Sequence, residues 1–187
     1  MSIKSNKHQY YKKDILRVLN KGGPDMGFIL KRTTLLGTLG ALIFAVDQSF
    51  KNRIEAEPEG SLPRDMDGKR GSYVRFARYH NRGFALGRLK ERPELVKSIG
   101  TAGCASLLLT YVTALVRRES IIRQTGLMLA ISGAFSNLFD RLTRGYVVDY
   151  IIIKRKPLDR IVINIGDAAI FAGSLLMAIS SLAKTGK

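Results

Sequence analysis

Four long apolar stretches divide this chain, at about residues 30–48, 97–116, 121–139 and 161–183, and charged segments separate them. A helix needs about 20 mostly apolar residues to cross the hydrocarbon core of a bilayer. In lipid, a spanning backbone must satisfy its own hydrogen bonds, so each stretch is expected to be helical. The sequence therefore predicts an all-α membrane protein with four transmembrane helices.

The composition by itself resembles that of a soluble domain, because 25% of the residues are charged and the mean hydropathy is +0.00. A formal net charge of +16 would also suit a nucleic-acid-binding protein. However, residues 1–32, 51–97 and 141–160 hold eight, twelve and six Lys or Arg, and the stretches between them are almost uncharged. This segregation favours a membrane protein, and we expect no nucleic-acid partner.

The charged segments also indicate the domain organisation. Residues 1–32 are expected to form a basic tail, residues 33–183 one four-span unit, and residues 184–187 a short C-terminal tail. The long connection between the first two spans, residues 51–96, starts with a Pro- and Gly-rich stretch that is typical of a loop.

A short strand is predicted within that connection. In residues 73–80 bulky and basic side chains alternate, which is typical of a strand with one apolar face. A turn at 81–83 would allow residues 84–86 to pair back onto it. The sequence therefore predicts a small, cradle-like β-sheet at the membrane surface, between the first and second helices.

The order of the spans places several carboxylates together. The end of the first stretch, the end of the third and the start of the fourth must lie at one membrane face, and Asp47, Asp140 and Asp167 occupy these positions. The connection 141–160, which carries Asp149, joins the last two stretches at the same face. A carboxylate beside a membrane span is costly to keep there, so each is a candidate functional group.

The charges next to the first span indicate the orientation. Lys31 and Arg32 precede this span, which favours a cytoplasmic N-terminus, and four spans then return the C-terminus to the same side. The totals oppose this orientation, with thirteen Lys or Arg on the cytoplasmic side and eighteen on the other. The positive-inside rule, by which cytoplasmic segments are rich in Lys and Arg, gives most weight to charges close to the first helix. We therefore expect both termini in the cytoplasm and the aspartates at the outer face.

Thiol and metal chemistry have little support in the sequence. The single cysteine, Cys104, lies among Gly, Ala and Ser in the second stretch and is expected to be a buried bystander. His8 and His80 stand alone, and the chain has no His-x-x-x-His or Cys cluster that could hold a metal ion. We expect neither a metal nor another cofactor.

Five short motifs, in order along the chain, resemble those of the signal peptidase II family, the lipoprotein signal peptidases. They are Asp47-Gln48-Ser49-Phe50-Lys51, Asn81-Arg82-Gly83-Phe84-Ala85-Leu86-Gly87, Gly133-Ala134-Phe135-Ser136-Asn137-Leu138-Phe139-Asp140-Arg141, Gly145-Tyr146-Val147-Val148-Asp149 and Asn164-Ile165-Gly166-Asp167. The resemblance implies an aspartic endopeptidase of the bacterial cytoplasmic membrane that removes signal peptides from diacylglyceryl-modified prolipoproteins. Its partners would be these substrates and membrane lipids, and we expect it to act as a monomer.

The same resemblance implies that Asp149 and Asp167 are the catalytic pair. In such a pair one ionised carboxylate takes a proton from the attacking water while a protonated partner polarises the peptide carbonyl. Two close carboxylates share a proton, because ionising both of them at once would place two negative charges next to each other at a high electrostatic cost. The amides of Asn137 and Asn164 are expected to position the pair or the substrate backbone. By resemblance, the substrate-binding and supporting residues are Asn81, Gly83, Asn137, Asp140, Arg141, Asn164, Asp47 and Lys51.

Two pairs among the supporting residues also have a purely structural interpretation. Asp140 is followed by Arg141, and an adjacent cation would favour a permanently ionised carboxylate that anchors the following loop. Asp47 and Lys51 have the i,i+4 spacing of an ion pair on one helix face, so they are expected to pair at the end of the first helix.

The chain departs from the family pattern beside its last aspartate. Gly166 and Ala168 stand where the family usually has Ala and Ser. Ala168 has no hydroxyl that could donate a hydrogen bond to Asp167, which could weaken activity. The alternative function is therefore that of a catalytically weakened relative, which binds lipoprotein precursors or lipid without cleaving them.

Overall fold

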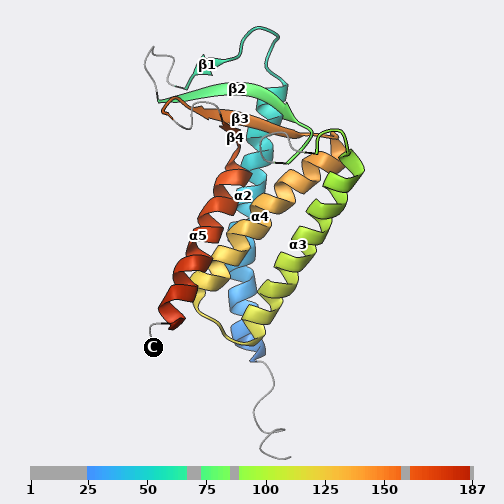
Figure 1. Ribbon diagram of the computed structural model, residues 1–187. Coiled ribbons are helices and arrows are strands. Elements are labelled where there is room, and N and C mark those ends of the chain that lie inside the picture. Colours follow the sequence, from blue (N-terminus) through green and yellow to red (C-terminus); the bar gives the residue numbers. More distant parts are fainter. Residues whose placement is uncertain (1–24, 67–72, 85–88, 157–160, 186–187) are drawn as a thin grey trace, which may run out of the picture.

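Four long helices run alongside one another, and a small sheet covers one end of them (Figure 1). The structure is a computed structural model that describes residues 25–66, 73–84, 89–156 and 161–185. In this part of the chain the helices are α2 (Met26–Glu55), α3 (Pro93–Val116), α4 (Ile121–Thr143) and α5 (Ile165–Thr185). The start of α2 and the end of α5 lie at the end opposite the sheet (Figure 1).

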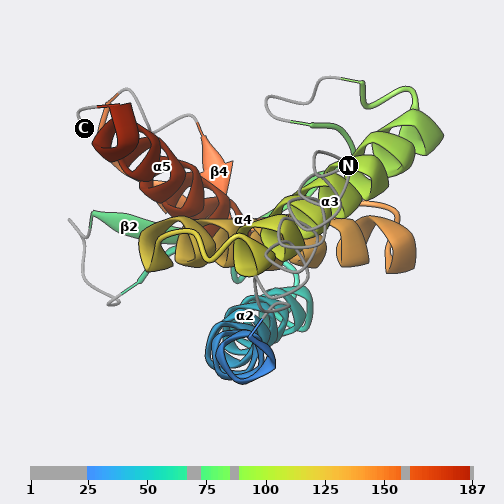
Figure 2. The ribbon, with the colours of Figure 1, turned by 90° about the horizontal axis from the view of Figure 1, so that it is seen from below.

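Helix α4 is the centre of the bundle. It packs against α2, α3 and α5, and the view along the bundle shows it between the other three (Figure 2). Within the described residues, α2, α3 and the Ile165–Ala183 part of α5 are long and apolar enough to cross a membrane. Helix α4 has a comparable length of 23 residues, but several of its polar side chains are buried, among them Gln124, Ser136, Asn137 and Asp140.

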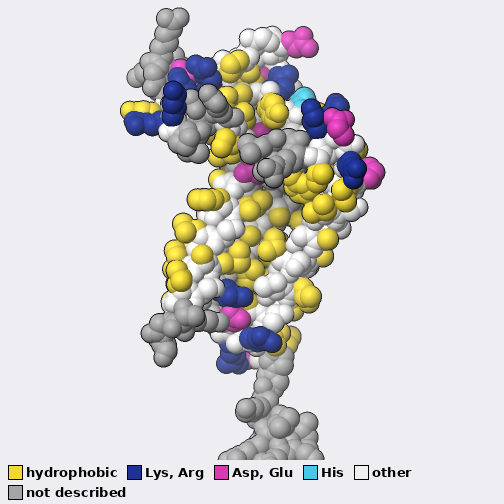
Figure 3. Space-filling view, in the orientation of Figure 1, with side chains coloured by type: hydrophobic (Ala, Val, Ile, Leu, Met, Phe, Trp, Pro, Cys, Tyr) yellow, Lys and Arg dark blue, Asp and Glu magenta, His cyan; other side chains and the backbone are white. Residues whose placement is uncertain are grey.

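The outside of the helices has the character of a lipid-facing surface. Hydrophobic side chains lie along the middle of the molecule, while charged side chains gather at its two ends (Figure 3). Large exposed apolar residues occur on α2, α3 and α5, such as Leu35, Leu109 and Phe171. The predicted fold class, a helical membrane protein with four helices and a small sheet, is confirmed.

The helices differ in extent from the predicted spans at several of their ends. The first helix begins at Met26 instead of about residue 30, because Asp25 caps it by accepting a hydrogen bond from the Phe28 N–H at 3.0 Å. Part of the predicted basic tail therefore belongs to α2, and residues 1–24 of that tail lie outside the described residues. The fourth helix begins at Ile165, because Val162–Ile163 form strand β4 instead.

The sheet is antiparallel, with the order β1-β2-β3-β4. Its strands are β1 (Arg64–Asp65), β2 (Val74–Asn81), β3 (Val147–Ile153) and β4 (Val162–Ile163). The predicted strand at 73–80 is confirmed as β2. Of the predicted return segment, Phe84 is described and is not in a strand, and the remainder lies outside the described residues.

The sequence predicted that the sheet lies within the connection between the first two helices. The sheet in fact also contains strands from a second connection. Strand β2 pairs with β3 from Val74↔Ile153 to Asn81↔Val147, so half of the sheet comes from the connection between α4 and α5. Strand β3 is rich in β-branched residues and its first half is buried, which suits a pleated strand at the centre of a sheet. This pairing places the second motif, which begins at Asn81, beside the fourth motif, which contains Val147. Both lie near the end of α4, which carries the third motif.

Helices α4 and α5 approach each other closely through glycines. A Cβ atom at Gly133 would lie 2.1 Å from the Gly166 carbonyl oxygen, and one at Gly173 would lie 2.4 Å from the Gly126 carbonyl oxygen. Small residues at such crossings allow two membrane helices to pack backbone against backbone. The first turn of α5 is thereby held against the C-terminal half of α4.

Candidate active site

The structure brings Asp149 and Asp167 together from different elements, β3 and the first turn of α5. Asn164 lies between them. Its Nδ2 atom donates to Asp149 Oδ1 at 2.7 Å, and its backbone N–H donates to Asp167 Oδ2 at 3.3 Å. One residue therefore holds both carboxylates of the predicted pair.

Asp149 has a second amide donor. Asn81, the last residue of β2, donates through Nδ2 to Asp149 Oδ2 at 3.1 Å, and its Oδ1 accepts from the Gly83 N–H at 3.1 Å. Both oxygens of Asp149 are thus occupied, and the residue is only 2% exposed. The predicted supporting residues Asn81 and Gly83 do lie beside the candidate pair.

Asp167 is positioned by α4 and by the start of its own helix. Asn137 Nδ2 donates to Asp167 Oδ1 at 2.8 Å. The Asp167 N–H donates to Asn164 Oδ1 at 2.8 Å, which is the arrangement of a helix N-cap. Asn137 Nδ2 and the Asn164 backbone N–H therefore hold the carboxylate without help from the exposed Ala168.

A buried lysine orients the amide of Asn137. Lys51 Nζ lies 3.0 Å from Asn137 Oδ1, and the same oxygen accepts from Asn164 Nδ2 at 3.1 Å. Because the oxygen of this amide is used by two donors, its nitrogen is left to face Asp167. Lys51 therefore acts on the candidate pair through Asn137.

The predicted pairing of Asp47 with Lys51 is confirmed, at 2.7 Å between Asp47 Oδ2 and Lys51 Nζ. The pair is fully buried, and Asp140 Oδ2 is also 3.0 Å from Lys51 Nζ. Ser136 adds a hydrogen bond to Asp47 Oδ2 at 2.6 Å. Two carboxylates and one ammonium group thus form a buried ionic cluster behind the candidate site.

The prediction that Asp140 pairs with Arg141 was wrong. Besides Lys51, Asp140 pairs with Arg144, and it accepts from Gln48 Nε2 at 3.0 Å and from the Val148 N–H at 3.1 Å. Consecutive residues of a helix point in different directions, whereas residues at i and i+4 share a face. The i,i+4 spacing of Asp140 and Arg144 was the sequence signal for the correct pair.

Arg141 instead joins α4 to the turn that follows β2. Its Nη2 atom donates to the Gly83 carbonyl oxygen at 2.9 Å, and its guanidinium carbon lies 5.3 Å from the centroid of the Phe84 ring. Its Nη1 atom donates to the Asn137 carbonyl oxygen at 3.3 Å. Arg141 is thus part of the surroundings of the pair, as predicted, but as a contact of this turn and not of Asp140.

The environment of Asp149 keeps its carboxyl partly protonated near neutral pH. Burial raises the pKa of Asp149 to about 7, and the negative charge of Asp167 acts in the same direction. The hydrogen bonds from Asn81 and Asn164 oppose this shift of the pKa. One protonated and one ionised carboxyl group, which acid–base hydrolysis requires, can therefore coexist in the pair.

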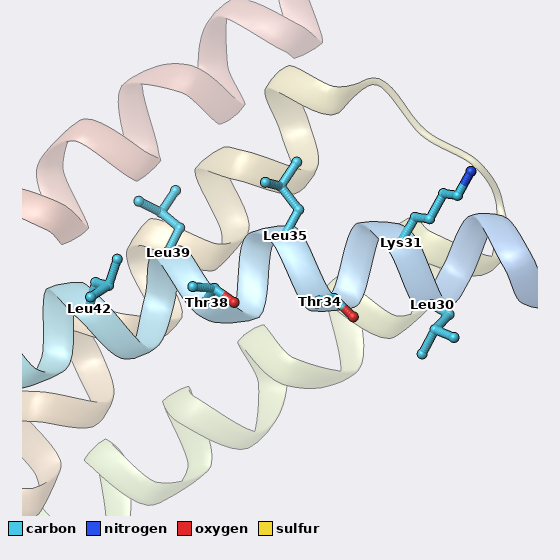
Figure 4. Close-up of a pocket in the computed structure, with 7 residues that line it drawn as sticks. All are labelled: Leu30, Lys31, Thr34, Leu35, Thr38, Leu39 and Leu42. Carbon is cyan, nitrogen blue, oxygen red and sulfur yellow. The ribbon is translucent and has the colours of Figure 1, made fainter.

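Two other features of the described residues are not part of this site. No group of three or more His, Cys, Asp or Glu side chains in the described part of the chain could hold a metal ion. An open groove of about 690 Å³ runs along one side of α2 and is lined by Leu30, Lys31, Thr34, Leu35, Thr38, Leu39 and Leu42 (Figure 4). It contains no carboxylate, and its leucines suit contact with lipid.

Fold and site together define a helical membrane protein with a pair of aspartates in a network of amides where the helices meet the sheet. The profile of signal peptidase (SPase) II matches residues 39–183, and the chain belongs to this family. The resemblance seen in the motifs is thereby confirmed.

Curated relatives agree with this membership, and a solved structure shares the fold. The chain is 28% identical over 151 residues to a lipoprotein signal peptidase of Moorella thermoacetica, covering 80% of this chain and 93% of the relative. It is 31% identical over 114 residues to a lipoprotein signal peptidase of Teredinibacter turnerae, covering 59% and 67%. A bacterial membrane enzyme solved by the in meso method at 2.3 Å resolution shares the fold, with a TM-score of 0.68, 20% identity and coverage of 87% of this chain and 92% of that one.

Proposed function

We propose that this protein is an aspartic endopeptidase that removes signal peptides from diacylglyceryl-modified prolipoproteins, with Asp149 and Asp167 as its catalytic pair. The observation that carries the proposal is the position of Asn164, which donates a hydrogen bond to each carboxylate. Family membership supplies the substrate class, since the curated relatives are named lipoprotein signal peptidase.

The chemistry follows from one proton shared by two carboxyl groups. The ionised carboxylate takes a proton from water as the water oxygen attacks the carbonyl carbon of the scissile peptide bond. The protonated carboxyl donates to the carbonyl oxygen, and collapse of the tetrahedral intermediate transfers a proton to the departing amine. Burial and the negative charge of Asp167 raise the pKa of Asp149, so this residue can hold the shared proton at and below neutral pH.

We also propose that both termini face the cytoplasm, that the active site lies at the outer face of the bacterial cytoplasmic membrane and that a monomer suffices. The end opposite the sheet carries Lys31, Arg32, Arg117 and Arg118 next to the ends of helices, which favours a cytoplasmic position. The donors to both aspartates come from a single chain. Membrane lipids are proposed to cover the apolar surface of the helices (Figure 3).

Cleavage of lipid-modified precursor by the purified protein tests the function. We expect release of the signal peptide from a diacylglyceryl-modified prolipoprotein at least about tenfold faster than from the same unlipidated precursor. Each buried CH₂ group of the acyl chains contributes about 0.8 kcal/mol, and a tenfold preference needs only about 1.4 kcal/mol. The measurement is the rate of release in detergent, with the Asp149→Asn variant as the control for contaminating peptidases.

The outcomes separate the candidate functions. Equal rates on both precursors would indicate a general membrane peptidase with no lipid requirement. Binding of the lipidated precursor without any cleavage would favour the catalytically weakened relative. Each of the two carboxylates accepts two hydrogen bonds, although Gly166 and Ala168 depart from the family pattern. This favours an active enzyme over the catalytically weakened relative.

The pH dependence of cleavage follows from the raised pKa of Asp149. As the pH rises through about 7, the proton shared by the pair is lost and the general acid disappears, so the rate should fall on the alkaline side. The measurement is kcat/KM for the lipidated precursor between about pH 5 and pH 9. A flat profile across this range would contradict the assignment.

The variant Asn81→Ala provides a second test of the same pH profile. Asn81 donates to Asp149, and this hydrogen bond lowers the pKa of the carboxyl. Its removal should move the alkaline limb of the profile to higher pH, because the ionised form loses a donor. A limb that moves to lower pH would show that another group controls it.

A further inference from the structure

We propose that Tyr150 is a positioning residue whose hydroxyl sets the spacing between Asp149 and Asp167. The inference rests on the proposed function, since it concerns the same pair of aspartates. Tyr150 directly follows Asp149 in β3 and is fully buried, with 0% exposure.

The hydroxyl of Tyr150 joins three elements of the fold. It donates to Asp47 Oδ1 of α2 at 2.9 Å and accepts from the Ile165 N–H, at the start of α5, at 3.3 Å. The first N–H groups of a helix have no partner within the helix, so this contact satisfies a group that would otherwise need another acceptor. Strand β3 is thereby tied both to α2 and to the first residue of α5.

The geometry of a strand explains why this contact controls the pair. Consecutive residues of a strand point to opposite sides, so Asp149 and Tyr150 leave β3 in opposite directions. On one side Asp149 meets the amides, and on the other Tyr150 holds the strand at Ile165, two residues before Asp167. The distance between the strand of one aspartate and the helix of the other therefore depends on this hydroxyl together with Asn164 and the pairing of β3 with β4.

The anchor of the hydroxyl is itself fixed. Asp47 accepts from Tyr150 with one oxygen, while its other oxygen contacts Lys51 and Ser136. The Tyr150 ring stacks on Phe50, with centroids 5.8 Å apart and an angle of 7° between the planes. The ring is thus held by packing, and the hydroxyl alone makes the polar contacts to α2 and α5.

The hydroxyl keeps the same hydrogen-bonding role over the working range of pH. Burial raises the pKa of Tyr150 far above its usual value, and the negative charge of Asp47 raises it further. Tyr150 therefore remains a neutral donor to Asp47 and an acceptor from Ile165 while the aspartate pair titrates.

Tyr150→Phe tests the proposal, because it removes the hydroxyl and retains the stacked ring. We expect kcat for the lipidated precursor to fall by about tenfold to a hundredfold with KM little changed, since small displacements of reacting groups have costs of this size. We also expect the alkaline limb of the pH profile to move to lower pH. With a wider pair, the charge of Asp167 raises the pKa of Asp149 less.

Tyr111→Phe is the matched control. Tyr111 is also buried, at 3% exposure, but it packs with Leu36 and Leu127 in the interior of the bundle, away from the sheet. It should leave the pH profile in place. A Tyr150→Phe enzyme with the kcat and pH profile of the wild type would overturn the proposal. Failure of this variant to fold in detergent would also overturn it, by assigning the hydroxyl to stability alone.

The wild-type protein separates this inference from the proposed function. No cleavage of the lipidated precursor by the wild type would reject the proposed function itself. Cleavage by the wild type, together with an unchanged Tyr150→Phe variant, would reject only the role of Tyr150.

Discussion

Asp149→Asn and Asp167→Asn are each expected to fold normally and to lose turnover by several orders of magnitude. Each change keeps the shape of the side chain but removes either the base or the shared proton. General acid–base catalysis typically contributes about 10²–10⁴-fold, and both steps of the proposed reaction depend on it. The measurement is single-turnover cleavage of the lipidated precursor, with thermal melting in detergent as the test of folding.

Glu94→Gln is the control for these variants. Glu94 is an exposed carboxylate on α3 that pairs with Lys97 at 2.9 Å, so its loss should leave turnover within about twofold of the wild type. Near-normal turnover in either aspartate variant would remove that residue from the catalytic pair.

Lys51→Met should destabilise the protein by about 3–5 kcal/mol, the range for breaking a buried ion pair by removing one partner. The change leaves Asp47 and Asp140 buried without the ammonium group that lies between them. It also removes the donor to Asn137 Oδ1, so the amide that holds Asp167 can turn. Activity should therefore fall together with the melting temperature.

Lys97→Met separates this effect from the simple loss of a lysine. Lys97 pairs with Glu94 at the surface of α3, and exposed pairs contribute about 0–1 kcal/mol. Its loss should leave both the stability and the activity nearly unchanged. If Lys51→Met were as stable as Lys97→Met, the buried cluster would not be held by charge.

Asp140 illustrates how far local spacing can predict a contact. The sequence predicted an ionised carboxylate that anchors a loop, and Asp140 does hold the start of β3 through the Val148 N–H at 3.1 Å. Its cations are nevertheless Lys51 and Arg144, not the neighbouring Arg141. Adjacency in sequence was misleading because a helix turns adjacent side chains away from each other.

The sheet shows the same limit at longer range. The alternation of side chains predicted β2 within one residue at each end, because that pattern is local. Its partner β3 is more than sixty residues away in the chain, as in the pair Asn81↔Val147. No local pattern identifies such a partner, and without it the donation from Asn81 to Asp149 could not be foreseen.

The sequence by itself determined the helical membrane fold and the face to which the aspartates come. Those properties depend on the length of the apolar stretches and on their order, both of which are visible in the chain. Only the tertiary structure decided which groups hold the carboxylates: Asn164 between the pair, Lys51 behind Asn137, and Tyr150 between Asp47 and Ile165. The reason is that a hydrogen bond depends on distances of a few ångströms between side chains of different elements, and packing alone sets these distances.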